Sequence, residues 1–153
     1  MNPTVREAEA ADVPTVEVVR RQAMEAGFEG VYDRADFAPL VASPSADLPS
    51  WVTAADHLAL VVETDVTVVA FGVLDVPAGQ IRALYTAPEY QRRGCASALL
   101  ARFETRAADD GADTISVVTP RNAVGFFESR GFERQEPVER DGLACSRLTK
   151  PLA

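Results

Sequence analysis

Residues 85–96 pass from an apolar strand into a glycine-containing turn, and that turn opens a long helical pattern. The first backbone N–H groups of a helix have no partner within the helix and lie at the positive end of its dipole, so this arrangement can bind a phosphate. Gly94 lets the backbone approach an anion without a Cβ in the way. The sequence therefore predicts an α/β fold with a phosphorylated ligand at this turn.

Two widespread phosphate-binding motifs are absent from the turn. The residue after Gly94 is Cys95, whereas a nucleoside-triphosphate loop needs Lys-Ser or Lys-Thr at that point. The three-glycine fingerprint of dinucleotide-binding folds is missing as well. The ligand should carry phosphate and be held through another motif.

A short pattern of Gln or Arg, two residues, Gly, one residue, then Gly or Ala is matched by Gln91, Arg92, Arg93, Gly94, Cys95 and Ala96. This pattern resembles the signature of the GCN5-related N-acetyltransferase (GNAT) family. Further family-like positions lie upstream, at Ile81, Leu84, Thr86 and Pro88. A second family-like segment covers residues 122–132, and the similarity extends from about Arg6 to Lys150, weakest over residues 27–57.

Length and composition fit one small enzyme domain. The 153 residues, 47% of them hydrophobic, suffice for one core, so we expect a single domain over residues 1–153, which the resemblance implies is an N-acetyltransferase domain. The N-terminus has no basic stretch followed by an apolar run, and no apolar segment is long enough to span a bilayer, which favours a cytoplasmic protein without membrane contact. Cys95 and Cys145 have no neighbouring His, so we expect reduced thiols and no metal site.

The chain is acidic, with 23 acidic against 15 basic residues and a net charge of -8. Lys150 is its only lysine. Because nucleic-acid binding depends on clusters of basic residues, a nucleic-acid partner is not expected. An acidic surface can attract cationic amines, or it can simply keep the protein solvated in a salt-rich cytoplasm.

The first half of the chain predicts a strand over residues 4–8 and then a helix that Asp12 and Pro14 begin. This helix should reach about Ala26 and end at Gly27. Prolines interrupt residues 27–56, which predicts a short helix and a long loop. The aromatic residues of this region could line an acceptor pocket or pack in the core, and they are Phe28, Tyr32, Phe37 and Trp51.

The second half predicts a hairpin of strands 58–63 and 66–76, then a strand over 80–86 whose family-like positions require a bulge. A helix over 95–110, a strand over 114–119 and another helix follow. The last strands, 132–138 and 143–148, flank Asp141-Gly142, a favoured hairpin turn. Together with the resemblance, this implies a GNAT-like α/β/α sandwich around one mixed, mostly antiparallel sheet with a bulged central strand.

The resemblance implies acetyl-CoA as the acyl donor, with a primary amine attacking its thioester directly. The N–H of Thr86 would polarise the thioester carbonyl, and Tyr85 is the second candidate for a catalytic role. Main-chain groups of Leu84, Tyr85 and Thr86 on the bulged strand would pair with the pantetheine arm. The residues implied for cofactor binding are Leu84, Tyr85, Thr86, Gln91, Arg92, Arg93, Gly94, Cys95, Ala96, Ser97, Asn122 and Phe127. The alternative for Arg92 and Arg93 is that they are solvated charges in an exposed turn.

Several positions depart from the family pattern. Phe127 stands where many members carry a Tyr that protonates the CoA sulfur, although its ring could still pack against the pantetheine. Gln80 stands where some members use Glu as a base, and an amide cannot take up a proton at neutral pH. Pro120 replaces a CoA-contacting Asn, so Asn122 is either a cofactor contact or a helix cap. A helix start should also lower the pKa of Cys95.

Proton transfer must then fall to other groups, for which the candidates are Tyr85, Glu89, His57 and Glu63. The acceptor could be a small amine, an antibiotic, an amino acid or a protein N-terminus, since residues 27–57 carry no readable motif. A catalytically silent acyl-CoA-binding module is the rival interpretation. Further alternatives are that the chain forms a homodimer or is a subunit of a larger acetyltransferase.

Overall fold

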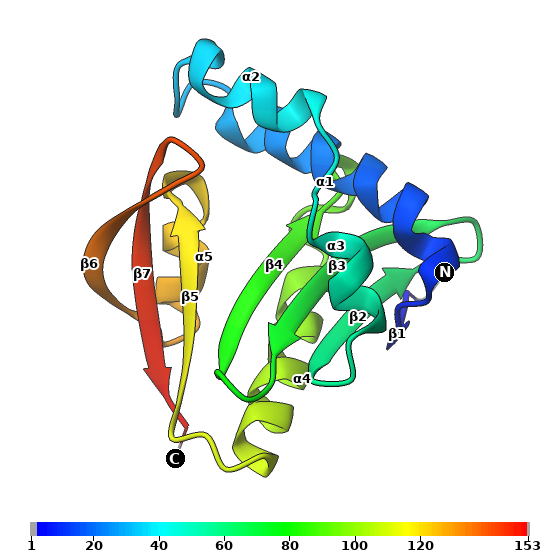
Figure 1. The fold of residues 1–153 in the computed structure, drawn as a ribbon, viewed down its shortest axis with the longest axis vertical. Coiled ribbons are helices and arrows are strands. Elements are labelled where there is room, and N and C mark those ends of the chain that lie inside the picture. Colours follow the sequence, from blue (N-terminus) through cyan, green and yellow to red (C-terminus); the bar gives the residue numbers. More distant parts are fainter. Residues whose placement is uncertain (1–2, 153) are drawn as a thin grey trace.

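The computed structural model describes residues 3–152, in which one sheet has the strand order β1-β2-β3-β4-β5-β7-β6 (Figure 1). The strands are β1 (Thr4–Glu7), β2 (His57–Glu63), β3 (Val68–Asp75), β4 (Gln80–Thr86), β5 (Thr114–Pro120), β6 (Glu133–Arg140) and β7 (Leu143–Pro151). Neighbouring strands are antiparallel except for β4 and β5, which are parallel. The predicted mixed, mostly antiparallel sheet is confirmed.

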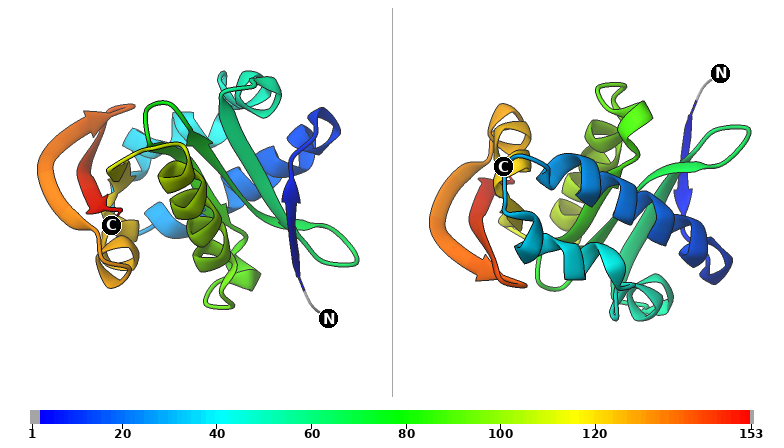
Figure 2. Two further views of the ribbon diagram at one scale, coloured as in Figure 1. Left: turned by 90° about the horizontal axis from the view of Figure 1, so that it is seen from below. Right: turned by 90° about the horizontal axis from the view of Figure 1, so that it is seen from above.

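Helices cover both faces of the sheet. They are α1 (Val13–Phe28), α2 (Arg34–Ala42), α3 (Leu48–Thr53), α4 (Cys95–Asp109) and α5 (Val124–Ser129), with single 3-10 turns at η1 (Ala10–Asp12), η2 (Pro88–Tyr90) and η3 (Arg121–Ala123). One face packs against α1, α2 and α3 and the other against α4 and α5, which gives the predicted α/β/α sandwich (Figure 2). Seen from above, α2 runs back alongside α1.

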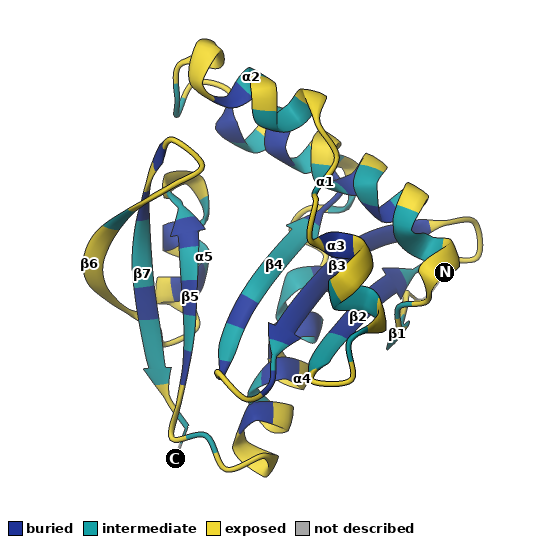
Figure 3. Cartoon of the chain, in the orientation of Figure 1, coloured by how far each residue is buried: buried dark blue, intermediate teal, exposed yellow. Residues whose placement is uncertain are grey.

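The core on the α4 side is the larger one and follows the predicted helical spacing. Leu99, Leu100 and Phe103 are at most 2% exposed and pack on the sheet. At the rim, Lys150 Nζ on β7 lies 2.8 Å from Glu104 Oε1 on α4. Figure 3 shows β3 buried along nearly its whole length and the edge strand β6 mostly exposed. Most side chains of β6 are charged. Charges on an exposed edge discourage pairing with other chains.

The bulge predicted in β4 is present, and its extra residue is Arg82. Val73 pairs with Ala83 and Leu74 with Ile81, so Arg82 has no partner on β3. On its other side β4 pairs with β5 only at Gln80↔Ser116 and Ile81↔Val117. Beyond this point the two strands diverge, as Figure 1 shows. The carboxyl-terminal half of β4 is therefore left without a strand neighbour on the β5 side.

Residues 27–57 differ most from the prediction. Helix α1 continues through Gly27 to Phe28, and the left-handed glycine comes later, at Gly30 with φ 77°. Two helices, α2 and α3, replace the expected short helix and long loop. Phe37 is 1% exposed and packs with Phe28, their ring centroids 5.7 Å apart. Packing against α1 thus stabilises α2 even though Pro39 interrupts its hydrogen-bond ladder.

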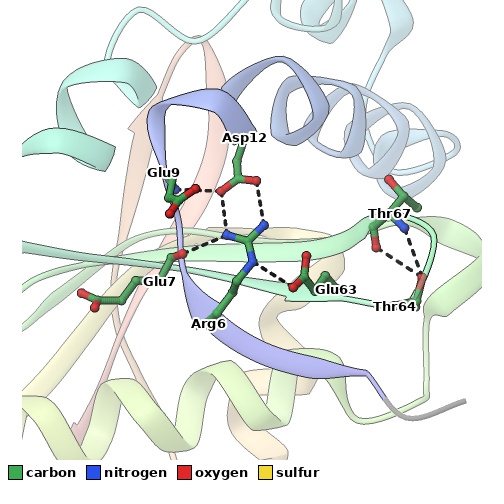
Figure 4. A network of polar contacts seen from close by, with 7 residues as sticks. All are labelled: Arg6, Glu7, Glu9, Asp12, Glu63, Thr64 and Thr67. Carbon is green, nitrogen blue, oxygen red and sulfur yellow. Dashed lines mark hydrogen bonds and ion pairs between the residues drawn. The ribbon is translucent and has the colours of Figure 1, made fainter.

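A partly buried ion network joins β1 to β2 and to the start of α1 (Figure 4). The Arg6 guanidinium donates to both carboxylate oxygens of Asp12, at 2.9 and 2.8 Å, and its Nε lies 2.9 Å from Glu63 Oε1. Asp12, predicted to cap α1, stands at that position but caps the preceding 3-10 turn, since its Oδ2 accepts from Glu9 N at 2.7 Å. The Arg6 hydrogen bonds lower the pKa of Asp12.

Candidate functional site

A cavity of about 740 Å³ opens where β4 and β5 diverge and continues beneath α1. Its first part, here called the cleft, is lined by Leu84, Thr86, Val117, Thr119, Ala96 and Phe127. Its second part, here called the chamber, is lined by Arg20, Met24, Phe28, Tyr85, Arg140 and Leu143. The cavity thus connects the turn before α4 with the helical layer on the opposite face of the sheet.

Main-chain groups of β4 face the cleft at every second residue. Ala87 N donates to Val69 O at 2.8 Å, and Thr86 pairs in register with Ala70. Because hydrogen-bonded and non-hydrogen-bonded pairs alternate in an antiparallel ladder, Leu84 and Thr86 direct their N–H and C=O groups away from β3, into the cleft. The main-chain groups of Tyr85, which we expected to face the cleft, are taken up by β3. The side chain of Tyr85 is therefore the part of this residue that can face the cavity it lines.

The segment over residues 91–96, here called the phosphate turn, contains the left-handed Gly94, with φ 83°, directly before α4 begins at Cys95. Ala98 N makes the first helical hydrogen bond of α4, to Gly94 O at 2.9 Å. The N–H groups of Cys95, Ala96 and Ser97 therefore have no partner within the helix. A Cβ on Gly94 would meet no atom within 4 Å, so φ rather than space requires glycine here.

The side chains of the phosphate turn differ in their contacts. Gln91 Nε2 donates to Thr86 O at 3.1 Å, which links the turn to the end of β4. Arg92 is exposed, and the Arg93 guanidinium lies 5.1 Å from the centre of the Tyr90 ring. Cys95 was expected to have a lowered pKa because it stands at a helix start. This expectation was wrong, because burial raises the pKa of its thiol.

The segment around α5 forms the far wall of the cleft. Phe127 is 2% exposed and packs edge-on against Phe126, with 5.2 Å between ring centroids. Asn122 makes no capping hydrogen bond to η3 or α5, so the cap interpretation does not hold. It faces α1 instead, since a Cβ on Gly27 would lie 2.5 Å from Asn122 Nδ2.

Sequence reasoning missed Arg130, which reaches the first turn of α4. Its Nη2 donates to Ser97 Oγ at 2.6 Å, and its guanidinium lies 5.6 Å from the centre of the Phe126 ring. A cation therefore stands beside the N-terminus of α4, where an anion would bind. The only available signal was its place in the family-like segment 122–132, which gives no direction for its side chain.

The family model for the acetyltransferase (GNAT) domain matches residues 50–151. This chain belongs to the GNAT family. A GCN5-related N-acetyltransferase from Rhodopseudomonas palustris has a similar fold, with a TM-score of 0.87, 23% identity, and 99% and 97% of the two chains covered. The PaiA N-acetyltransferase from Thermoplasma acidophilum, solved with coenzyme A, gives a TM-score of 0.84 at 21% identity, covering 99% of each chain.

A curated relative, the amino-acid acetyltransferase of Pseudomonas fluorescens (strain Pf0-1), is 40% identical over 78 residues. The matched stretch is 51% of this chain and 18% of that protein. The GNAT chain therefore spans only a small part of the length of this relative.

Of the four candidates for proton transfer in this GNAT domain, only Tyr85 lines the cavity. Its hydroxyl makes no side-chain hydrogen bond within residues 3–152, and burial raises the pKa of the phenol. His57 Nδ1 lies 2.7 Å from Asp56 Oδ1, and Glu63 pairs with Arg6. Glu89 lies outside the cavity, at a separate depression on the surface beside α1.

The aromatic residues of region 27–57 lie both at the cavity and in the core. Trp51 lines the cavity, Phe37 packs in the core, and Phe28 does both, since it is 3% exposed and packs in the same cluster as Phe37. Tyr32 links the segment after α1 to β7 and η3, since its hydroxyl donates to Ala144 O at 2.6 Å and accepts from Arg121 N at 2.9 Å.

Among residues 3–152 no three His, Cys, Asp or Glu side chains lie together as they would around a metal ion. Within the same residues, no helix has the length and apolar character to cross a membrane.

Proposed function

We propose that this chain transfers the acetyl group of acetyl-CoA to a primary amine by direct attack of the amine on the thioester. The observation that carries this proposal is one continuous cavity that joins the phosphate turn, the diverging strands β4 and β5, and the chamber under α1. A single path through the protein thus offers a phosphate site, unpaired main-chain groups and room for an acceptor.

The donor lies in the cleft. The free N–H groups of Cys95, Ala96 and Ser97 bind its pyrophosphate, assisted by the guanidinium of Arg130. The pantetheine arm pairs with the cleft-facing main chain of β4 as an added strand would. The N–H of Thr86 polarises the thioester carbonyl and stabilises the oxyanion that forms there.

Proton transfer uses few protein groups. Because burial raises the pKa of Tyr85, its phenol is protonated at neutral pH and acts as a hydrogen-bond donor and not as a base. Phe127 has no proton to give, so the sulfur departs as a thiolate or takes its proton from Tyr85 or water. The cavity is lined by neither His nor Glu, so the attacking amine loses its proton to water or to a lining carboxylate, Asp47 or Asp141.

Calorimetric titration of acetyl-CoA tests the donor site, with Gly94→Glu and Gly111→Glu as a matched pair. Both glycines have positive φ, at 83° and 92°, and open space around a Cβ, but they lie at opposite ends of α4. Gly94→Glu places a carboxylate among the phosphates and should weaken binding about tenfold or more. Gly111→Glu should bind as the wild type does. Equal effects of the two variants would contradict the proposal.

A catalytically silent acyl-CoA-binding module is the second candidate, and the phenyl ring of Phe127 favours it. Measurement of CoA release with a panel of amines distinguishes the silent module from the acetyltransferase. Binding of acetyl-CoA by the folded protein without any amine-dependent CoA release would support the silent module. An amino acid belongs in the panel because a relative is named amino-acid acetyltransferase.

A further inference from the structure

Arg140 spans the point where β4 and β5 separate. Its Nη1 lies 3.3 Å from Val118 O on β5, and its Nη2 lies 3.4 Å from Arg82 O on β4. The last paired residues of the two strands are Ile81 and Val117, so these carbonyls belong to the first residues after the pairing ends. The guanidinium therefore stands at the apex of the cleft, on the boundary with the chamber.

The hairpin of β6 and β7 fixes this position. Arg140 pairs with Leu143 as the last pair before the turn, and the two turn residues Asp141 and Gly142 have φ 54° and 80°. Two successive left-handed residues make the tight hairpin turn whose twist matches that of the strands. The side chain thus extends from a rigid element, although it comes from the edge strand of the sheet.

The cavity is lined by three arginines, and they differ in their carboxylate partners. Arg82 Nη2 lies 2.8 Å from Asp75 Oδ2, and Arg20 Nη1 lies 3.7 Å from Oε2 of the largely buried Glu17. The nearest acid to Arg140 is Asp141 at 4.0 Å, whose side chain is 64% exposed. Long hydrogen bonds to two carbonyls leave its positive charge without a close counter-ion.

We infer that the acceptor is an amine that also carries a carboxylate, and that Arg140 binds this carboxylate. The inference rests on the proposed acetyl transfer. A guanidinium presents parallel N–H donors that match a carboxylate, so the exchange of two long carbonyl contacts for a charged partner is favourable. Since Arg140 lies beside the cleft, an acceptor with its amine one or two carbons from the carboxylate places the nitrogen near the thioester.

The transfer itself leaves the carboxylate unchanged. The amine nitrogen forms a bond to the acetyl carbon, the bond from that carbon to sulfur breaks, and the electron pair leaves with the CoA sulfur. The nitrogen releases one proton to solvent, and the thiolate takes up one. Arg140 is thus a binding and positioning residue for the acceptor and takes no part in proton transfer.

Matched acceptors test this inference. Glycine, alanine and glutamate are compared with their α-amides and methyl esters by following CoA release, in wild type and in Arg140→Gln and Arg140→Lys. The acids should exceed the amides about tenfold or more in kcat/KM, because a site that binds a charged group discriminates against its neutral analogue. Arg140→Gln should abolish that preference, mainly through KM, and Arg140→Lys should retain part of it.

Arg147→Gln is the control, since Arg147 lies on the same hairpin but pairs with Glu136 at 3.3 Å outside the cavity. It should keep the preference for acids. Thermal unfolding and acetyl-CoA binding show whether each variant is folded. Equal use of acids and amides by the wild type, or an unchanged preference in folded Arg140→Gln, would overturn the inference.

Calorimetry of the same acids and amides with the CoA-loaded protein separates this inference from the proposed function. Tighter binding of acids that is lost in Arg140→Gln, without acetylation of any acceptor, supports the carboxylate site and contradicts the transferase. Acetylation of amides and esters at rates equal to those of the acids supports the transferase and contradicts the carboxylate site.

Discussion

The side-chain amide of Gln91 donates a hydrogen bond to the main-chain carbonyl of Thr86, across 3.1 Å. The first residue of the phosphate turn is thereby tied to the last residue of β4. Because a carbonyl oxygen has two lone pairs, Thr86 O can still accept a second hydrogen bond from a ligand in the cleft. The signature glutamine thus holds the two halves of the donor site in one geometry.

Gln91→Glu should therefore weaken acetyl-CoA binding about tenfold, since a carboxylate cannot donate to Thr86 O and adds negative charge near the phosphates. Gln91→Ala should have a smaller effect. Calorimetry measures both. Gln135→Ala on β6, which removes a comparable exposed amide hydrogen bond at 2.9 Å to Thr149, should leave binding unchanged. Wild-type affinity in Gln91→Glu would show that this link has no role.

Tyr85→Phe removes a hydroxyl that has no side-chain partner within the described residues. We expect kcat to fall about 10²-fold if the phenol takes part in proton transfer, with acetyl-CoA binding retained and stability within about 0.5 kcal/mol of wild type. Tyr32→Phe is the contrasting control, because that hydroxyl makes two hydrogen bonds. It should cost about 1–2 kcal/mol of stability. Unchanged kcat in Tyr85→Phe would exclude the catalytic role.

Asp12→Asn should lower stability at neutral pH by about 1–2 kcal/mol, since it breaks the charged contact with Arg6. Arg6 lowers the pKa of Asp12 in the folded protein, so the contribution is complete above the ordinary value of 3.8 and is lost as pH falls through the folded value. Urea unfolding of both proteins across pH 2–7, a range about the pKa of carboxyl groups, should show the difference shrinking toward acid. A difference independent of pH would contradict this account.

Gly72→Ala should destabilise the protein by about 1–3 kcal/mol. A Cβ at this position on β3 would lie 2.7 Å from Phe103 Cε2 and 3.1 Å from Ala83 O, so neither the core nor the sheet has room for it. Gly125→Ala is the control, because a Cβ there meets no atom within 4 Å. Thermal unfolding should show Gly125→Ala close to or above wild type. Equal midpoints for the two variants would contradict the packing around Phe103.

The sequence predicts features that depend on local geometry. Gly94 marks the turn because the first residue before α4 needs a positive φ, and the spacing of Ile81, Leu84 and Thr86 requires an extra residue, which is Arg82. Only one short helix was predicted within residues 27–56, whereas α2 and α3 both form there. The contacts between Phe37 and α1 that stabilise α2 leave no periodicity in the sequence.

Site residues that depend on distant contacts could not be predicted. Arg130 and Ser97 are 33 positions apart, and Arg140 and Arg82 are 58 apart, yet each pair is joined by a hydrogen bond. Charge and spacing give no direction for such side chains. Asp12 illustrates the same limit at short range, since its position at the helix start was right while its carboxylate turned to Arg6 and Glu9.

The single lysine has a practical meaning for enzymology. Lys150 carries the only side-chain amine of the chain, and its Nζ lies 2.8 Å from Glu104 Oε1. An amine held in an ion pair is a poor nucleophile and both cysteine thiols are buried, so thioesters in solution find almost no side chain on this protein to acylate. Long incubations with acetyl-CoA should therefore leave the side chains unmodified. In mass spectrometry of an acetylated acceptor, the enzyme itself should then add almost no acetylated background.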